Sequence, residues 1–261
     1  KPMKNMKLLF TAIVSLFLFF CLGCNSLRTA ENLAPVPRVE YPLVKDGQAN
    51  ASIIRFPKDD VVAFFGGIEL RDYIERITGV RLERTRQVSA DRINVYIALL
   101  RQPGLELPAK ARALTQKIRD DGFALYSDSS GVYVLAEQNA GLCYGVYELL
   151  KRYGNVRWIS PGPEGEFVPK SASFVVPELA EVVNPSFKHR EFNLVGVGPR
   201  NSKKTTLWQL RNGMKPHKGE VKNIDITGKR LGGHIFSTLL PDSLFPEHPE
   251  LFGLYDGKRI P

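Results

Sequence analysis

The chain has 261 residues, a net charge of +9 and a hydrophobic content of 43%, so it can form one folded domain and part of another. The positive charge is uneven, because residues 25–187 carry 20 basic and 20 acidic residues while residues 188–261 carry 13 and 7. A basic segment of this kind can indicate nucleic-acid binding, an acidic ligand or simply a solvated surface.

The N-terminus has the pattern of an export signal. Lys4 and Lys7 precede an uncharged apolar run over residues 8–22, which ends at Gly23 and Cys24. A basic start, a short apolar segment and a small residue before the cleavage point are signal-peptide features. A Cys directly after that small residue resembles the lipoprotein box of bacteria, in which the thiol is acylated. The alternative, a transmembrane anchor, would need about 20 apolar residues.

We therefore predict a lipoprotein signal peptide over residues 1–24, with lipidation at Cys24 and a membrane-anchored location in the bacterial cell envelope. An exported protein seldom meets nucleic acid, so we expect no nucleic-acid partner and consider an acidic glycan the better candidate. Cys143 would then be the one remaining cysteine, and it is predicted to be a buried structural thiol. His189 and His217 lack zinc-ligand spacing, so no metal or cofactor is predicted.

Residues 25–50 are predicted to form a tether between the lipid and the first domain. Pro35, Pro37 and Pro42 interrupt regular structure there, and polar residues dominate. A spacer of this kind needs no hydrophobic core.

The first domain is expected to begin near Ala51 with a strand over residues 52–56. Asp59 or Asp60 can cap the helix that follows, and Gly79 stands where a helix commonly ends. The apolar residues between them recur close to a 3.6-residue period. These residues are Val61, Phe64, Phe65, Ile68, Leu70, Ile74 and Ile77.

The next elements alternate between strands and helices. Patterns of apolar residues predict an edge strand over 81–86, a covered strand over 94–100 and a short helix over 109–119. Two strands joined by a hairpin turn, a helix and a final short strand follow, over 123–127, 132–136, 142–153 and 156–159. This mixture predicts an α+β fold, a two-layer sandwich with a mixed sheet and helices on one face.

Four motifs in this order carry a family resemblance. They are DGFAL from Asp121, GVYVL from Gly131, the helix over 141–150, and VRW from Val156. The set resembles the N-terminal auxiliary domain of α-glucuronidases, the family 67 glycoside hydrolases, and its relative in family 20 hexosaminidases.

The resemblance places the auxiliary domain at residues 51–182 and implies that it supports a catalytic barrel rather than supplying catalytic groups. Its aromatic residues are accordingly expected in the core rather than on a sugar-binding surface. They are Phe123, Tyr144, Tyr147 and Trp158.

Residues 183–261 resemble the beginning of such a barrel. PSFKHR from Pro185 resembles the lead-in, and GGHIF, HPELF and DGKR further on resemble a large bacterial family of unknown function that follows the same auxiliary domain. That family is thought to have a glycoside-hydrolase-like (β/α)8 barrel, which needs about 250 residues. We therefore expect a truncated barrel, with its first strand at 192–197 and its catalytic carboxylates beyond Pro261.

Three residues of this second segment are candidates for substrate binding. Arg190 lies at the start of the expected barrel, where family 20 enzymes use an Arg to hold sugar hydroxyls; a surface ion pair with Glu191 or Asp225 is the alternative. Asn212 could donate to a sugar hydroxyl or cap a helix. His234 could contact sugar, carry a proton or be a buried histidine satisfied by backbone.

No acidic pair after residue 190 has the pattern that glycoside hydrolysis requires, and Glu250 is the best single carboxylate. The sequence therefore predicts an exported lipoprotein that resembles a glycoside hydrolase, binds carbohydrate and acts in polysaccharide degradation, including uronate-bearing glycans, although this fragment lacks the catalytic carboxylates. The alternative is a non-catalytic glycan-binding or scaffold lipoprotein, which leaves enzymatic activity open.

Overall fold

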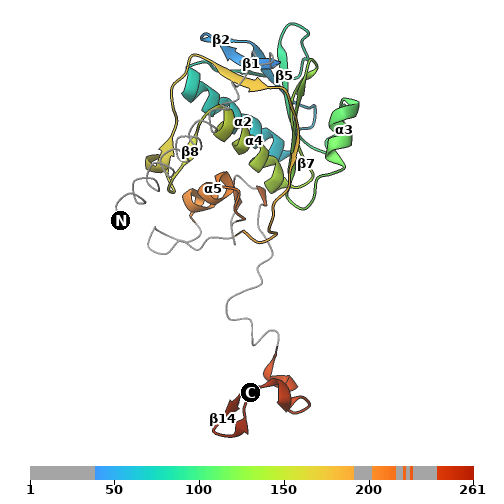
Figure 1. Ribbon diagram of the computed structural model, residues 1–261, viewed down its shortest axis with the longest axis vertical. Helices are drawn as coiled ribbons and strands as arrows, with labels where there is room; N and C mark the ends of the chain where they lie inside the picture. The colour runs from blue at the N-terminus through green and yellow to red at the C-terminus, as the bar shows by residue number, and fades with distance from the viewer. Residues whose placement is uncertain (1–38, 191–201, 216–219, 222–223, 226–239) are drawn as a thin grey trace, which may run out of the picture. The chain divides into compact units, whose positions relative to one another are not determined.

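The computed structural model describes residues 39–190, 202–215, 220–221, 224–225 and 240–261 (Figure 1). The predicted signal peptide with Cys24, the expected strand over 192–197 and His234 lie outside these residues. In the described parts, no helix has the length and apolar character needed to cross a membrane.

The main sheet has six strands in the order β11-β6-β7-β5-β3-β4. Strands β4, β3, β5 and β7 run parallel to one another, whereas β6 and β11 are antiparallel to their neighbours. The strand bounds are β3 (Ala51–Ile54), β4 (Glu83–Thr85), β5 (Ile93–Leu99), β6 (Phe123–Asp128), β7 (Gly131–Ala136) and β11 (Leu179–Val183). This confirms the predicted mixed sheet.

Two long helices, α2 (Val61–Thr78) and α4 (Asn139–Tyr153), pack on one face of this sheet (Figure 1). The short helix α3 (Ala109–Thr115) lies on the opposite face. The strands between them alternate: Val132 and Val134 of β7 join the α2–α4 core, while Tyr133 and Leu135 join the α3 side. The α+β character is thus as predicted, with one short helix added on the second face.

The ends and glycines of α2 follow from its sequence. Asp60 caps the helix by accepting a hydrogen bond from the Val62 backbone at 3.0 Å, and Gly79 ends it with a left-handed backbone, φ 77°. A side chain at Gly66 would meet methyl groups of Ile97 and Val146 at 3.2 and 3.3 Å. The absence of a side chain at Gly66 therefore lets α2 lie close to the sheet and to α4.

The predicted tether over 25–50 is wrong for its last part. Residues 40–45 form β1 (Glu40–Lys45), which pairs with β10 (Phe174–Pro177) and with β2 (Gln48–Ala49) in a second, three-stranded sheet. Leu43 and Val44 are fully buried. The register shifts between Pro42 and Val44, and a bulge is a position where a ladder tolerates proline.

The remaining elements are short. The strand pair of β8 (Arg157–Trp158) and β9 (Glu166–Phe167) encloses the 3-10 helix η1 (Pro163–Gly165), and α5 (Lys203–Arg211) follows the main sheet. Residues 240–261, taken by themselves, contain η2, η3 and a terminal hairpin. The other bounds are β12 (Glu220–Val221), β13 (Ile224–Asp225), η2 (Asp242–Leu244), η3 (Pro249–Leu251), β14 (Leu254–Tyr255) and β15 (Lys258–Arg259).

Candidate functional site

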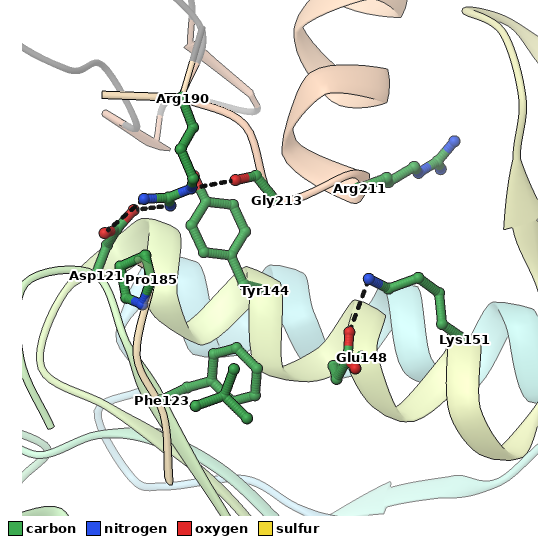
Figure 2. Close-up of a pocket in the computed structure, with 10 residues that line it drawn as sticks. Asp121, Phe123, Tyr144, Glu148, Lys151, Pro185, Arg190, Arg211 and Gly213 are labelled. Carbon is green, nitrogen blue, oxygen red and sulfur yellow. Dashed lines mark hydrogen bonds and ion pairs between the residues drawn. The ribbon is translucent and has the colours of Figure 1, made fainter. Parts of the chain in front are cut away.

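A cavity of about 180 Å³ lies where the domain meets the segment that follows it. Figure 2 shows that its walls come from the start of β6, one face of α4 and the chain around Pro185, Arg190 and Gly213. The lining residues are Asp121, Phe123, Tyr144, Glu148, Lys151, Val183, Pro185, Arg190, Arg211 and Gly213.

Glycines in α4 bring this helix close enough to the sheet to form one wall. A side chain at Gly141 would meet the Gly122 carbonyl oxygen at 2.5 Å, and one at Gly145 would meet Val134 at 2.6 Å. Tyr144 and Glu148 are four residues apart, so they share one face of α4. That face turns toward the cavity (Figure 2).

Arg190, the predicted sugar-binding arginine, lies in the wall of this cavity. Its Nη2 lies 2.5 Å from Oδ2 of Asp121, a carboxylate that is only 3% exposed, and its Nε donates to the Gly213 carbonyl at 2.8 Å. Its guanidinium lies 5.4 Å from the ring centre of Tyr144. Asp121 is thus an ion-pair partner of Arg190 that the sequence did not predict; the ion pair with Glu191 or Asp225 and the sugar contact by Arg190 both stay predictions.

The two carboxylates in the cavity wall are both held by cations. Asp121 also lies 3.5 Å from Nζ of Lys215, and Glu148 contacts Lys151 and Arg152 at 2.7 Å each. Burial raises the pKa of Glu148, but the hydrogen bonds and charges of Lys151 and Arg152 outweigh it and hold the pKa below its usual value. A general acid for glycoside hydrolysis needs a raised pKa, so Glu148 does not fit that role.

Next to the cavity, Arg211 at the end of α5 is the centre of a buried cluster. Its two Nη atoms lie 3.1 Å from Glu69 of α2 and 2.5 Å from Glu166 of β9. The guanidinium faces the rings of Tyr73, Tyr147 and Trp158 at 5.3 to 6.0 Å. We call these six residues the Arg211 cluster.

The aromatic members of the Arg211 cluster are themselves bonded to one another and to its carboxylates. Tyr73 donates to Glu166 at 2.9 Å and accepts from the indole of Trp158 at 2.8 Å, while Tyr147 donates to Glu69 at 3.1 Å. Burial raises the pKa of Tyr73 to about 12, so this phenol stays protonated at neutral pH. The cluster therefore joins α5 to the domain through α2, α4 and the β8–β9 pair.

Asn212 stands at the C-terminal end of α5, which was one of its two predicted roles. Its amide donates to the carbonyl oxygens of Trp158 and Trp208 at 3.1 and 2.9 Å. Cys143 is 1% exposed and burial raises the pKa of its thiol, as expected for a structural cysteine. His248 lies 3.2 Å from the exposed Glu250 in η3. Within the described ranges, no three acidic, His or Cys side chains could hold a metal ion.

Sequence reasoning missed the residues that hold this junction together. Asp121 was considered only as the first residue of the DGFAL motif, and Glu69, Glu166 and Arg211 were not singled out. A signal was present for Glu69, because it is a carboxylate inside a predicted apolar helix. Such a residue is rarely buried unless it is paired.

Several solved structures are similar, among them the Streptomyces plicatus N-acetyl-beta-hexosaminidase, with 22% identity over 59% of this chain and 25% of that chain, TM-score 0.37. A family GH115 4-O-methyl-alpha-glucuronidase has 15% identity over 67% of this chain and 25% of that one, TM-score 0.39. The Vibrio harveyi GH20 exo beta-N-acetylglucosaminidase has 12% identity over 59% and 18%, TM-score 0.35.

The chain thus spans a quarter or less of the length of these structures. No curated protein sequence matches it. Residues 45–149 match the family model described as the N-terminus of glycosyl hydrolase family 67, which confirms over these residues the resemblance to the α-glucuronidase N-terminal domain.

Proposed function

We propose that this protein is an exported, lipid-anchored, glycoside-hydrolase-like protein that acts in polysaccharide degradation. Its described domain is the auxiliary domain, which supports the segment after residue 183 rather than supplying catalytic groups. The observation that carries this proposal is the Arg211 cluster, in which one arginine from α5 lies between two part-buried carboxylates of the domain. The family match of residues 45–149 adds the glycan context.

The charges at the cavity favour a domain that supports the following segment over one that supplies catalytic groups. Asp121 and Glu148 are each bound by two cationic side chains, so neither is available as nucleophile or proton donor. Arg190 also donates to the carbonyl oxygens of Phe187 and Gly213 at 2.5 and 2.8 Å. The ion pair of Arg190 with Asp121 therefore joins the domain to the segment that follows it.

We expect the 261-residue chain to show no glycosidase turnover and, if the gene continues beyond Pro261, the longer product to hydrolyse a glycoside. The reason is that the domain offers no free carboxylate pair at its cavity, whereas hydrolysis needs two carboxyl groups flanking the bond. Aryl glycosides and glucuronoxylan fragments, assayed with both proteins, provide the measurement. Arg190→Ala and His234→Ala test whether these residues lie near the sugar.

Turnover by the 261-residue chain would show that catalytic groups lie within it. A longer product that binds glycans but hydrolyses none would favour the alternative of a glycan-binding lipoprotein. Activity that is unchanged in Arg190→Ala and His234→Ala, in proteins with an unchanged melting temperature, would remove both residues from the substrate site.

The predicted anchoring has its own test. Expression in a bacterium should yield a mature protein that begins at an acylated Cys24, because Gly23 and Cys24 end an uncharged segment after a basic start. Mass spectrometry of the mature N-terminus measures this, with Cys24→Ser as the variant that should stay uncleaved and unacylated. A mature wild-type protein with an unmodified Cys24 contradicts the proposed anchor.

A further inference from the structure

A second polar surface lies away from the cavity, around the edge strand of the main sheet. We propose that Arg55, Phe64 and Arg84 form a binding site for an anionic sugar residue, whose carboxylate or sulfate is held by the two guanidinium groups. We call these three residues the Arg84 site. The choice of a sugar as carrier of the anion rests on the proposed function.

Three elements bring the residues of the Arg84 site together. Arg55 directly follows β3, Phe64 stands in the first turn of α2, and Arg84 is the central residue of β4. Because β4 pairs with β3 and ends the sheet, this site faces a side of the domain that no further strand of the described sheet covers.

Contacts with the helix hold the Arg84 guanidinium in place. Its Cζ lies 4.3 Å from the ring centre of Phe64, and its Nη2 donates to the Phe64 carbonyl oxygen at 3.3 Å. A side chain at Gly67 would meet Arg84 Nε at 3.4 Å, so the guanidinium lies against the helix where that side chain is missing. Arg55 approaches the same ring, with its Cζ 5.6 Å from the centre.

The charge of Arg84 is only partly offset, by the nearby carboxylates of Asp59 and Asp72. Arg55 pairs with Asp59 at 3.0 Å and Arg71 with Asp72 at 2.9 Å, but no ion pair to Arg84 is formed by the described residues. Its Nε is buried without an acceptor. Burial and the charges of Arg55 and Arg71 lower the pKa of Arg84 and outweigh the opposite effect of Asp59 and Asp72, so an incoming anion would stabilise the charged guanidinium.

The chemistry of these groups indicates what the anion is attached to. A guanidinium fork matches the geometry of carboxylate and sulfate oxygens. Phe64 belongs to the apolar pattern of α2, yet it is 39% exposed, and the neighbouring Val61 is 57% exposed. This apolar surface beside two cations fits a ligand with an apolar ring face and a negative group, as an acidic sugar has.

The test uses calorimetry on the 261-residue chain at low salt. The ligands are a uronate trisaccharide, a sulfated trisaccharide and a neutral trisaccharide. We expect at least one anionic ligand to bind at least tenfold more tightly than the neutral one. Arg84→Gln and Arg55→Gln should each reduce that affinity about tenfold or more, since each removes one charged fork.

Two further variants distinguish this site from general attraction to a basic protein. Arg112→Gln removes a charge from α3, on the opposite face of the sheet, and should leave the affinity unchanged. Phe64→Leu should weaken the trisaccharide more than inorganic sulfate, because the ring positions the Arg84 guanidinium for both ligands but packs against the sugar alone. Which anionic trisaccharide binds identifies the carboxylate or the sulfate as the recognised group.

Three results would overturn the proposal. They are equal affinity for the neutral trisaccharide, binding that Arg84→Gln and Arg55→Gln leave unchanged, or an acidic peptide that binds as tightly as either anionic trisaccharide. Arg84→Gln also removes the contact with the Phe64 ring and the hydrogen bond to the Phe64 carbonyl oxygen, so its melting temperature is measured in parallel to show that the variant is folded. Binding without hydrolysis by any longer gene product would refute the proposed enzymatic activity and leave this site intact.

Discussion

Replacing Arg211 by methionine is expected to lower the free energy of unfolding by about 3–5 kcal/mol, the usual cost of removing one partner of a buried ion pair. Arg211 is 11% exposed, and its partners Glu69 and Glu166 are 13% and 9% exposed. The substitution keeps much of the apolar side chain but takes from Glu69 the cation it is paired with, while Glu166 keeps its ion pair with Arg76 at 2.5 Å. Urea unfolding followed by circular dichroism measures the loss.

Arg152→Met is the matched control for this experiment. Arg152 also contacts two carboxylates, Glu148 and Glu181, but its side chain is 35% exposed, and exposed ion pairs contribute about 0–1 kcal/mol. Adding Glu69→Gln to Arg211→Met should recover part of the lost stability, because it removes one unpaired charge. A loss below about 1 kcal/mol for Arg211→Met would mean that the cluster does not hold α5 on the domain.

Trp158→Ala is expected to cost about 3–5 kcal/mol, as other large aromatic truncations in protein cores do. The Trp158 side chain is 4% exposed and lies edge-on to the rings of Tyr73 and Tyr147, with centroids 5.5 and 5.2 Å away. Its removal leaves a cavity and takes one hydrogen-bond donor from the Tyr73 hydroxyl. Thermal unfolding of the variant and the unchanged protein measures the effect.

The control for this variant is Phe167→Ala in the neighbouring strand β9. Phe167 is 51% exposed, so its truncation should change stability by much less than that of Trp158. Glycan binding measured on both variants completes the test. A Trp158→Ala protein with an unchanged melting temperature but weakened glycan binding would show that this indole is a sugar-binding surface rather than part of the core.

Local patterns in the sequence were sufficient for most of the elements of the first domain. The apolar period and the caps at Asp60 and Gly79 predicted α2, and the structure has both caps. The continuous apolar run at 94–100 predicted a strand covered on both faces, which β5 is. These elements depend on residues a few positions apart, so local sequence patterns were enough to predict them.

The second sheet was missed for a physical reason. Strand β1 pairs with β10, about 130 positions further along the chain, and Pro42 made its segment resemble a spacer. Whether such a segment becomes a strand depends on a distant partner that supplies the hydrogen bonds, and sequence patterning by itself carries little information about that partner.

The sequence by itself determined the fold class, the family resemblance of the domain and the burial of its aromatic residues, because these follow from short-range patterns of apolar and turn residues. Only the tertiary structure decided the partners of its charges. Arg190 meets Asp121 across 69 positions, and Arg211 meets Glu69 across 142. A charged side chain has many possible partners of opposite sign along a chain. Only the folded backbone determines which carboxylate lies close enough to an arginine to form an ion pair with it.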